Sequence, residues 1–131
     1  MDFSVNAVAG FEFARLLSKK VLQRRGVEFV FISSVTSIFG RVGLATHSAS
    51  KGAIVSATKA MAIELAKQSI RVNSVSPGTV LTPLIEKLEP EQRAQRLSEY
   101  PLGLGKPDDV ANLSGFFLTK RQMDNRHKCH Y

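Results

Sequence analysis

Apolar side chains recur at helical spacing over residues 3–25, and this periodicity predicts an amphipathic helix. Gly26 stands just after it, where a glycine commonly ends a helix. A second helical pattern, rich in Ala, Ser and Gly, covers residues 45–68, and a third opens with a proline and covers 107–118. Residues 83–99 are amphipathic but interrupted by prolines, which predicts one or two short helices.

Two shorter runs have the pattern of strands. Residues 27–32 are almost continuously apolar and rich in β-formers, which predicts a strand buried on both faces, as in a parallel sheet. Residues 70–75 alternate and are followed by Pro77-Gly78, which predicts a second strand that ends in a turn. Residues 35–46 and 102–106 are expected to be loops. Strand, helix and strand in this order predict a βαβ unit, flanked by helices, of the α/β class.

Composition narrows the class of protein. A chain of 131 residues with 44% hydrophobic residues suits one folded domain. No apolar run approaches the roughly 18 residues that span a bilayer, and the first residues lack the features of a secretory signal. Cys129 is the single cysteine, so an internal disulfide is excluded and a reducing, cytoplasmic location is expected. Residues 119–131 are polar and basic, and we expect an irregular tail after a domain over 1–118.

The net positive charge of the chain is only a weak indication of its function. The chain has 18 Lys and Arg against 11 Asp and Glu, a formal charge of +7. The cations cluster over residues 19–25 and 120–128 without interleaved aromatic residues, which favours solvated surfaces over a nucleic-acid site. We therefore expect no nucleic-acid partner, although the charge keeps that alternative open. His127, Cys129 and His130 match no standard zinc spacing, so no metal site is expected.

Candidate chemistry gathers where the predicted strands end. Ser34 follows the first strand, and His47 and Lys51 lie one turn apart on the next helix. Because residues four apart share a helix face, both can face one crevice with Ser34. Ser, His and Lys in one crevice form an acid–base constellation. The alternative is structural: a capping serine, a surface histidine and a solvated lysine.

Four segments in order carry a resemblance to a known family: residues 32–34, 47–53, 70–83 and 107–112. Together they strongly resemble the short-chain dehydrogenase/reductase family, in particular the classical group that includes acyl-carrier-protein ketoreductases. The match extends over about residues 3–118. It implies a partial Rossmann-like domain, a fragment of a doubly wound parallel sheet.

The resemblance implies roles for individual residues. Asn6 resembles the asparagine that anchors a water for proton relay, and Ser34 resembles the serine that hydrogen-bonds the substrate oxygen. Lys51 resembles the lysine that holds the nicotinamide ribose. A loop that lines the nicotinamide is implied at Pro77, Gly78, Val80 and Thr82.

One position departs from the family pattern inside the site. The family has its catalytic tyrosine 13 residues after the serine and four before the lysine, and His47 stands there. An imidazole transfers protons, but it reaches roughly 2 Å less far from the backbone than a phenol oxygen. Since a misplacement of about 1 Å can cost on the order of 100-fold in rate, the substitution predicts weakened chemistry.

Both ends also depart from the pattern. The glycine-rich dinucleotide fingerprint does not occur, and Gly103-Leu104-Gly105 does not replace it, because it follows no predicted strand. The family's last strand is not legible after residue 118. We therefore expect a chain truncated at both ends, which lacks the dinucleotide-binding half and binds its cofactor weakly.

The resemblance thus implies an oxidoreductase that uses NAD or NADP to interconvert an alcohol and a carbonyl, in the manner of a 3-oxoacyl-carrier-protein reductase. It implies a small-molecule substrate and a homo-oligomer formed through helices 3–25 and 45–68. The alternative is a catalytically impaired remnant, or an interaction module that pairs through the same helices. No membrane contact is expected.

Overall fold

The computed structural model describes residues 3–21 and 27–119. The predicted helix over 3–25 begins as a π-helical turn at Ser4–Val8 and continues as α1 (Ala9–Val21). Its expected end at Gly26 and the basic tail over 120–131, with His127, Cys129 and His130, lie outside the described residues. The two predicted strands form as β1 (Glu28–Ile32) and β2 (Arg71–Val75), one residue shorter at the start than expected.

The connecting helix α2 (Ala45–Leu65) ends in a 3-10 turn at Ala66–Gln68, in agreement with the predicted range 45–68. The expected loop over 35–46 is partly wrong, since Val35–Ser37 form a 3-10 turn and α2 already begins at residue 45. The proline-interrupted stretch forms two short helices, α3 (Pro83–Glu86) and α4 (Pro90–Ser98).

The last helix, α5 (Pro107–Leu118), has the predicted bounds. Asp109 accepts a hydrogen bond from the backbone N–H of Lys106 and so caps the first turn, where acidic side chains also complement the helix dipole. None of the helices in the described ranges is long and apolar enough to cross a bilayer.

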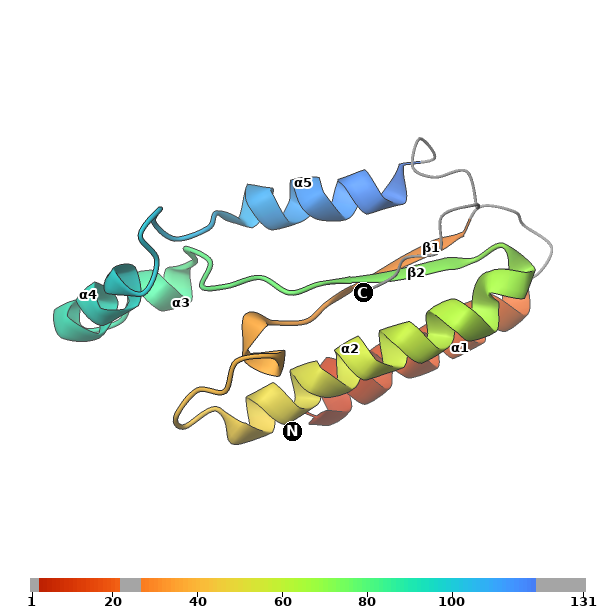
Figure 1. Cartoon of the computed structure of the whole chain (residues 1–131), viewed down its shortest axis with the longest axis horizontal. Coiled ribbons are helices and arrows are strands. Elements are labelled where there is room, and N and C mark those ends of the chain that lie inside the picture. The colour runs from red at the N-terminus through yellow and green to blue at the C-terminus, as the bar shows by residue number, and fades with distance from the viewer. Residues whose placement is uncertain (1–2, 22–26, 120–131) are drawn as a thin grey trace.

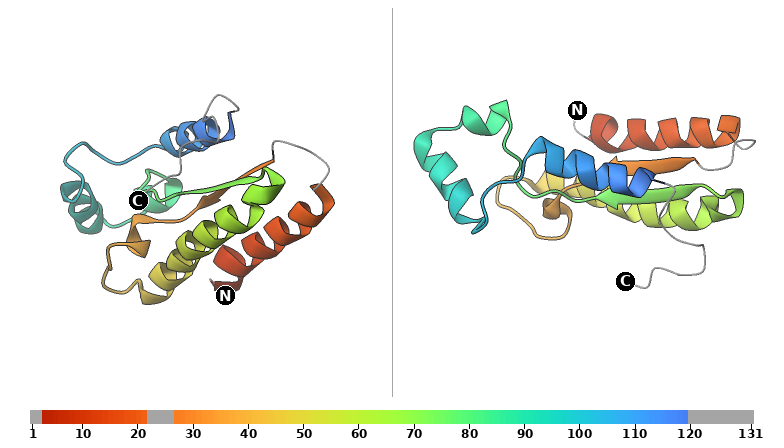
Figure 2. Two further views of the ribbon diagram at one scale, coloured as in Figure 1. Left: turned by 45° about the vertical axis from the view of Figure 1, so that its right-hand side comes forward. Right: turned by 90° about the horizontal axis from the view of Figure 1, so that it is seen from above.

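β1 and β2 pair in parallel, with Glu28 opposite Arg71 and Ile32 opposite Val75, so the predicted βαβ unit is present. Helices α1 and α2 lie side by side on one face of this sheet and α5 lies on the other (Figures 1 and 2). The structure therefore has the layered α/β arrangement that the sequence pattern predicts.

The core lies where α2 meets the sheet. Leu65, Ile70 and Val72 form its buried centre, and Phe29 and Phe31 pack against them. Burial of β1 on both faces, as expected from its apolar sequence, is wrong: four of its residues are half-buried and Ile32 is 43% exposed. Within the described residues β1 has one neighbouring strand, so its side chains lack lateral neighbours on the other side.

Candidate active site

The carboxyl ends of the two strands are joined by backbone hydrogen bonds beyond the sheet. The N–H of Ser33 donates to the carbonyl of Val75 at 2.7 Å, and the N–H of Val35 donates to Pro77 at 3.0 Å. These bonds hold the loop after β1 beside the loop after β2. In parallel α/β sheets this edge is where ligands bind.

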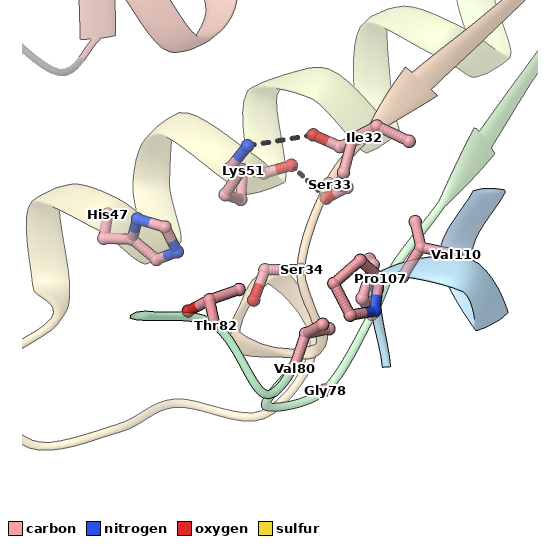
Figure 3. Close-up of a pocket in the computed structure, with 11 residues that line it drawn as sticks. Ile32, Ser33, Ser34, His47, Lys51, Gly78, Val80, Thr82, Pro107 and Val110 are labelled. Carbon is pink, nitrogen blue, oxygen red and sulfur yellow. Dashed lines mark hydrogen bonds between the residues drawn. The ribbon is translucent and has the colours of Figure 1, made fainter. Parts of the chain in front are cut away.

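A cavity of about 410 Å³ opens at this edge (Figure 3). This volume falls within the usual range for small-molecule sites. Seven of the eight predicted site residues line it: Ser34, His47, Lys51, Pro77, Gly78, Val80 and Thr82. The wall is completed by Ile32, Ser33, Pro107 and Val110.

Ser34 is held in place by the turn that it starts. Its Oγ accepts hydrogen bonds from the backbone N–H of Thr36 at 3.2 Å and from the Thr36 hydroxyl at 3.0 Å. These two bonds use the acceptor side of the hydroxyl. The Ser34 proton therefore stays available as a donor at the cavity, although the serine also serves as a helix cap.

His47 and Lys51 extend from neighbouring turns of α2 toward the cavity (Figure 3). The Lys51 ammonium donates to the carbonyl of Ile32 at 2.9 Å, and Ser33 Oγ donates to the carbonyl of Lys51 at 2.8 Å. These two bonds dock α2 on the end of β1. Partial burial lowers the pKa of Lys51, because the low-dielectric surroundings disfavour its charged form.

Asn6 does not line the cavity. It lies in the π-helical turn before α1, and its amide donates at 3.5 Å to Oγ of the fully buried Ser50. Ser50 in turn donates to the carbonyl of His47 at 2.8 Å. The contact of Asn6 with the site thus runs through the helix backbone behind His47. A π-helical turn is an uncommon feature that is often found at functional sites.

The far end of the loop after β2, residues 79–81, is held by hydrogen bonds to Gly105. The N–H of Gly105 donates to the carbonyl of Thr79 at 3.2 Å, and the N–H of Leu81 donates back to Gly105 at 2.7 Å. This bridge brings the start of α5 to the cavity, where Pro107 and Val110 form part of the wall. These two residues were not predicted as site residues, although the segment 107–112 that contains them carries the family resemblance.

Three comparisons relate this arrangement to known proteins. A family model described as enoyl-(acyl carrier protein) reductase matches residues 2–123. The chain belongs to the short-chain dehydrogenase/reductase family. It is 39% identical over 117 residues to 3-oxoacyl-(acyl-carrier-protein) reductase FabG of Thermotoga maritima, which covers 88% of this chain and 48% of that protein. It is also 37% identical over 125 residues to an inactive 2-(S)-hydroxypropyl-CoM dehydrogenase of Xanthobacter autotrophicus, covering 90% of this chain and 54% of that protein.

Solved structures agree with this assignment. A 3-oxoacyl-(acyl-carrier protein) reductase from Brucella melitensis superposes with a TM-score of 0.83 at 31% identity, over 88% of this chain and 44% of that one. A second Brucella melitensis reductase structure, with bound NAD, gives 0.79 at 31% identity, over 88% of this chain and 43% of that one. The partial Rossmann-like fold expected from the resemblance is confirmed. The chain spans about half the length of the relatives that it matches.

Proposed function

We propose that this short-chain dehydrogenase/reductase segment forms the substrate and nicotinamide side of an NAD- or NADP-dependent site that interconverts an alcohol and a carbonyl. The observation that carries the proposal is the common cavity of Ser34, His47 and Lys51. A donor hydroxyl, a proton-transferring imidazole and a cation are the groups that such a reaction needs near the carbonyl oxygen. The FabG relatives favour a 3-oxoacyl thioester as substrate.

In the proposed reduction, Ser34 donates a hydrogen bond to the carbonyl oxygen of the substrate and orients it. His47 gives a proton to that oxygen as the carbon gains a hydride. In the reverse direction His47 accepts the hydroxyl proton. When bound, a nicotinamide would supply or accept the hydride. Lys51, whose ammonium lies at the cavity wall, would hold the ribose next to it.

The residues present fit the nicotinamide end of the cofactor. The cavity combines apolar walls from Ile32 and Val110 with polar groups from Lys51 and Thr82. A flat aromatic amide attached to a ribose needs this combination of surfaces. In the described ranges, neither loop after a strand carries the glycine-rich dinucleotide fingerprint. We accordingly assign the described residues to the nicotinamide end.

We also propose that the protein self-associates through α1 and α2. Large apolar side chains on these helices remain exposed, including Phe13 at 62%, Leu16 at 50% and Ile63 at 79%. Burying them against a second copy would remove this apolar surface from water. The measurement is the mass in solution by sedimentation. A monomer at all concentrations would contradict the proposal.

A second candidate is a catalytically impaired member that acts through binding alone. The observation that favours it is His47, because the family motif has a tyrosine at that position. In this case the cavity binds ligands without turnover. Cofactor binding in the absence of activity toward any ketone would support this candidate.

Titration with NADH and NADPH tests the proposal directly, followed by an assay with a panel of 3-oxoacyl thioesters and simple ketones. We expect binding of at least one cofactor and slow, measurable turnover. Lys51→Ala should weaken binding, while Lys87→Ala, an exposed lysine in the turn after α3, is the matched control. If neither cofactor binds at millimolar concentration, the proposed function is wrong.

A further inference from the structure

Tyr100 lies outside the cavity but contacts the loop that lines it. It follows α4, and its hydroxyl oxygen accepts two hydrogen bonds from Thr79, one from the backbone N–H at 3.0 Å and one from the side-chain hydroxyl at 3.1 Å. Tyr100 also lines a second cavity of about 400 Å³ that shares Pro77, Gly78, Val80 and Val110 with the first. The loop after β2 therefore forms part of the wall of both cavities, and Tyr100 lines the second one.

The ring of Tyr100 also explains one glycine in this wall. A Cβ placed on Gly78 would lie 2.9 Å from Cε1 of Tyr100 and 3.2 Å from its hydroxyl oxygen. Real Cβ atoms do not approach a ring carbon at 2.9 Å, so any side chain at position 78 would displace the ring. The glycine and the tyrosine thus fit each other as a pair through close approach of ring and backbone.

We propose that Tyr100 is a positioning residue: through Thr79 and Gly78 it fixes the wall against which the nicotinamide binds. The proposal rests on the proposed function for its ligand and on the geometry for its mechanism. Tyr100 does not itself line the cavity of Ser34, His47 and Lys51, so it acts through the backbone of the loop.

The other hydrogen bonds that hold the loop do not use the N–H of Thr79. Pro77 is held through its carbonyl by Val35, and the carbonyl of Thr79 is held by Gly105. Both bonds fix carbonyl groups, whereas the N–H of Thr79 is bonded to the phenol. Without the phenol oxygen this donor would lose its partner, and the peptide between Gly78 and Thr79 would lose the hydrogen bond that fixes its orientation.

Tyr100 is itself held by its neighbour in sequence. Glu99 forms an ion pair with Arg41 from the loop before α2 and lies 4.0 Å from Arg96 on α4. This cluster ties the chain just before Tyr100 to the loop before α2. The position of Tyr100 is therefore held from two sides, by Thr79 at its hydroxyl and by the ion pair of the residue before it.

Hydrogen exchange of the Thr79 amide tests the geometry without any ligand. Tyr100→Phe keeps the ring beside Gly78 and removes only the acceptor oxygen. We expect exchange at Thr79 to become about tenfold faster or more, as for the loss of one protecting hydrogen bond. Amides of β2 should be unchanged. Tyr131→Phe, at the only other tyrosine of the chain, is the matched control.

Cofactor affinity tests the role. Tyr100→Phe should raise the Kd for the reduced cofactor about tenfold, with the melting temperature nearly unchanged. Gly78→Ala should have a similar or larger effect in the wild-type background. Its effect should be much smaller in a Tyr100→Ser background, because no ring is left for the new methyl group to displace. This coupling would not arise from a general loss of stability.

The outcomes separate the two proposals. Unchanged exchange at Thr79 in Tyr100→Phe overturns the positioning role, whatever the cofactor does. Faster exchange with an unchanged Kd also overturns it and leaves Tyr100 a purely structural contact. A wild-type chain that binds no cofactor defeats the proposed function instead, and the exchange experiment still decides whether Tyr100 fixes the loop.

Discussion

The two ends of the sheet use polar side chains in opposite ways, although the same two strands form both. At the amino end, Glu28 and Arg71 face each other across the strands and form an ion pair at 2.6 Å. Arg71 also donates to the carbonyl of Phe117 at 2.6 Å, which ties the last turn of α5 to the sheet. At the carboxyl end, Ser34, His47 and Lys51 face a cavity instead of one another.

The polar groups at the amino end stabilise the fold by pairing with one another. Those at the carboxyl end face a cavity and can bind a ligand. At the amino end Glu28 and Arg71 pair with each other. Among the described residues there, Oε2 of Glu28 is the atom buried without a hydrogen-bond partner. At the carboxyl end the Ser34 proton and the His47 ring keep unused hydrogen-bonding capacity. In parallel sheets ligands bind at the carboxyl ends of the strands, and the proposed site lies at this edge.

The largest expected effect is at the carboxyl end. His47→Tyr should raise the rate of carbonyl reduction on the order of 100-fold, because a phenol oxygen reaches roughly 2 Å further into the cavity than an imidazole nitrogen. The measurement is turnover at saturating cofactor and substrate. His47→Phe, which has the ring without the proton, is the control and should show no gain. No gain in His47→Tyr either would mean that the reach of His47 does not limit the reaction.

At the amino end the expected effect is on stability. Arg71→Met leaves the Glu28 carboxylate, whose side chain is 10% exposed, without its cation, and it releases the end of α5. Because Arg71 is itself 28% exposed, solvent screens the pair, and we expect a loss of about 2 kcal/mol in the free energy of unfolding. Urea unfolding measures it.

A second substitution separates charge from packing at this end. In Glu28→Gln/Arg71→Met the buried charge is gone, so part of the loss should be recovered. Cofactor affinity should be the same in all three proteins once they are folded. A large change in affinity would show that the two ends of the sheet are not independent.

Lys51 should give stability a distinctive pH dependence. Its pKa is lowered in the folded state by burial, so the unfolded chain binds this proton more tightly. The free energy of unfolding therefore rises with pH between the lowered pKa and 10.5, and below that window the cost of burying the ammonium is fully present. Lys51→Met should flatten this rise in urea unfolding measured from neutrality to alkaline pH. An identical profile in wild type and variant would contradict the burial of this charge.

The smallest expected effect concerns Tyr100. The hydrogen bond from the Thr79 hydroxyl lowers the pKa of Tyr100 below 10.0, the Thr79 N–H and the charges of Arg41 and Arg96 act in the same direction, and partial burial opposes them. Thr79→Val removes the hydroxyl and should move the pKa of Tyr100 back up. Absorbance of the tyrosinate, measured in a Tyr131→Phe background, reports this shift. Thr119→Val is a control, because Thr119 bonds only the end of α5.

The sequence and the family motif that it carries determined the helices, the strands and most of the residues that line the cavity. Helical spacing and end signals predicted α2 and α5 closely, because periodicity and capping act over a few residues. The order of strand and helix placed Ser34 and Lys51 at the same sheet edge, since Ser34 follows β1 and Lys51 lies in the first turns of the crossover helix that comes next. The family motif predicted that the loop from Pro77 to Thr82 lines the same cavity.

Tertiary structure alone decided which distant residues complete that edge. Tyr100 stands 21 positions from Thr79 and Arg41 stands 58 from Glu99, and no local pattern links either pair. The half-burial of β1 likewise does not follow from its own apolar residues, because they do not show how many strands lie beside it. Contacts between segments depend on where the whole chain places them, and periodicity within one segment carries no information about that placement.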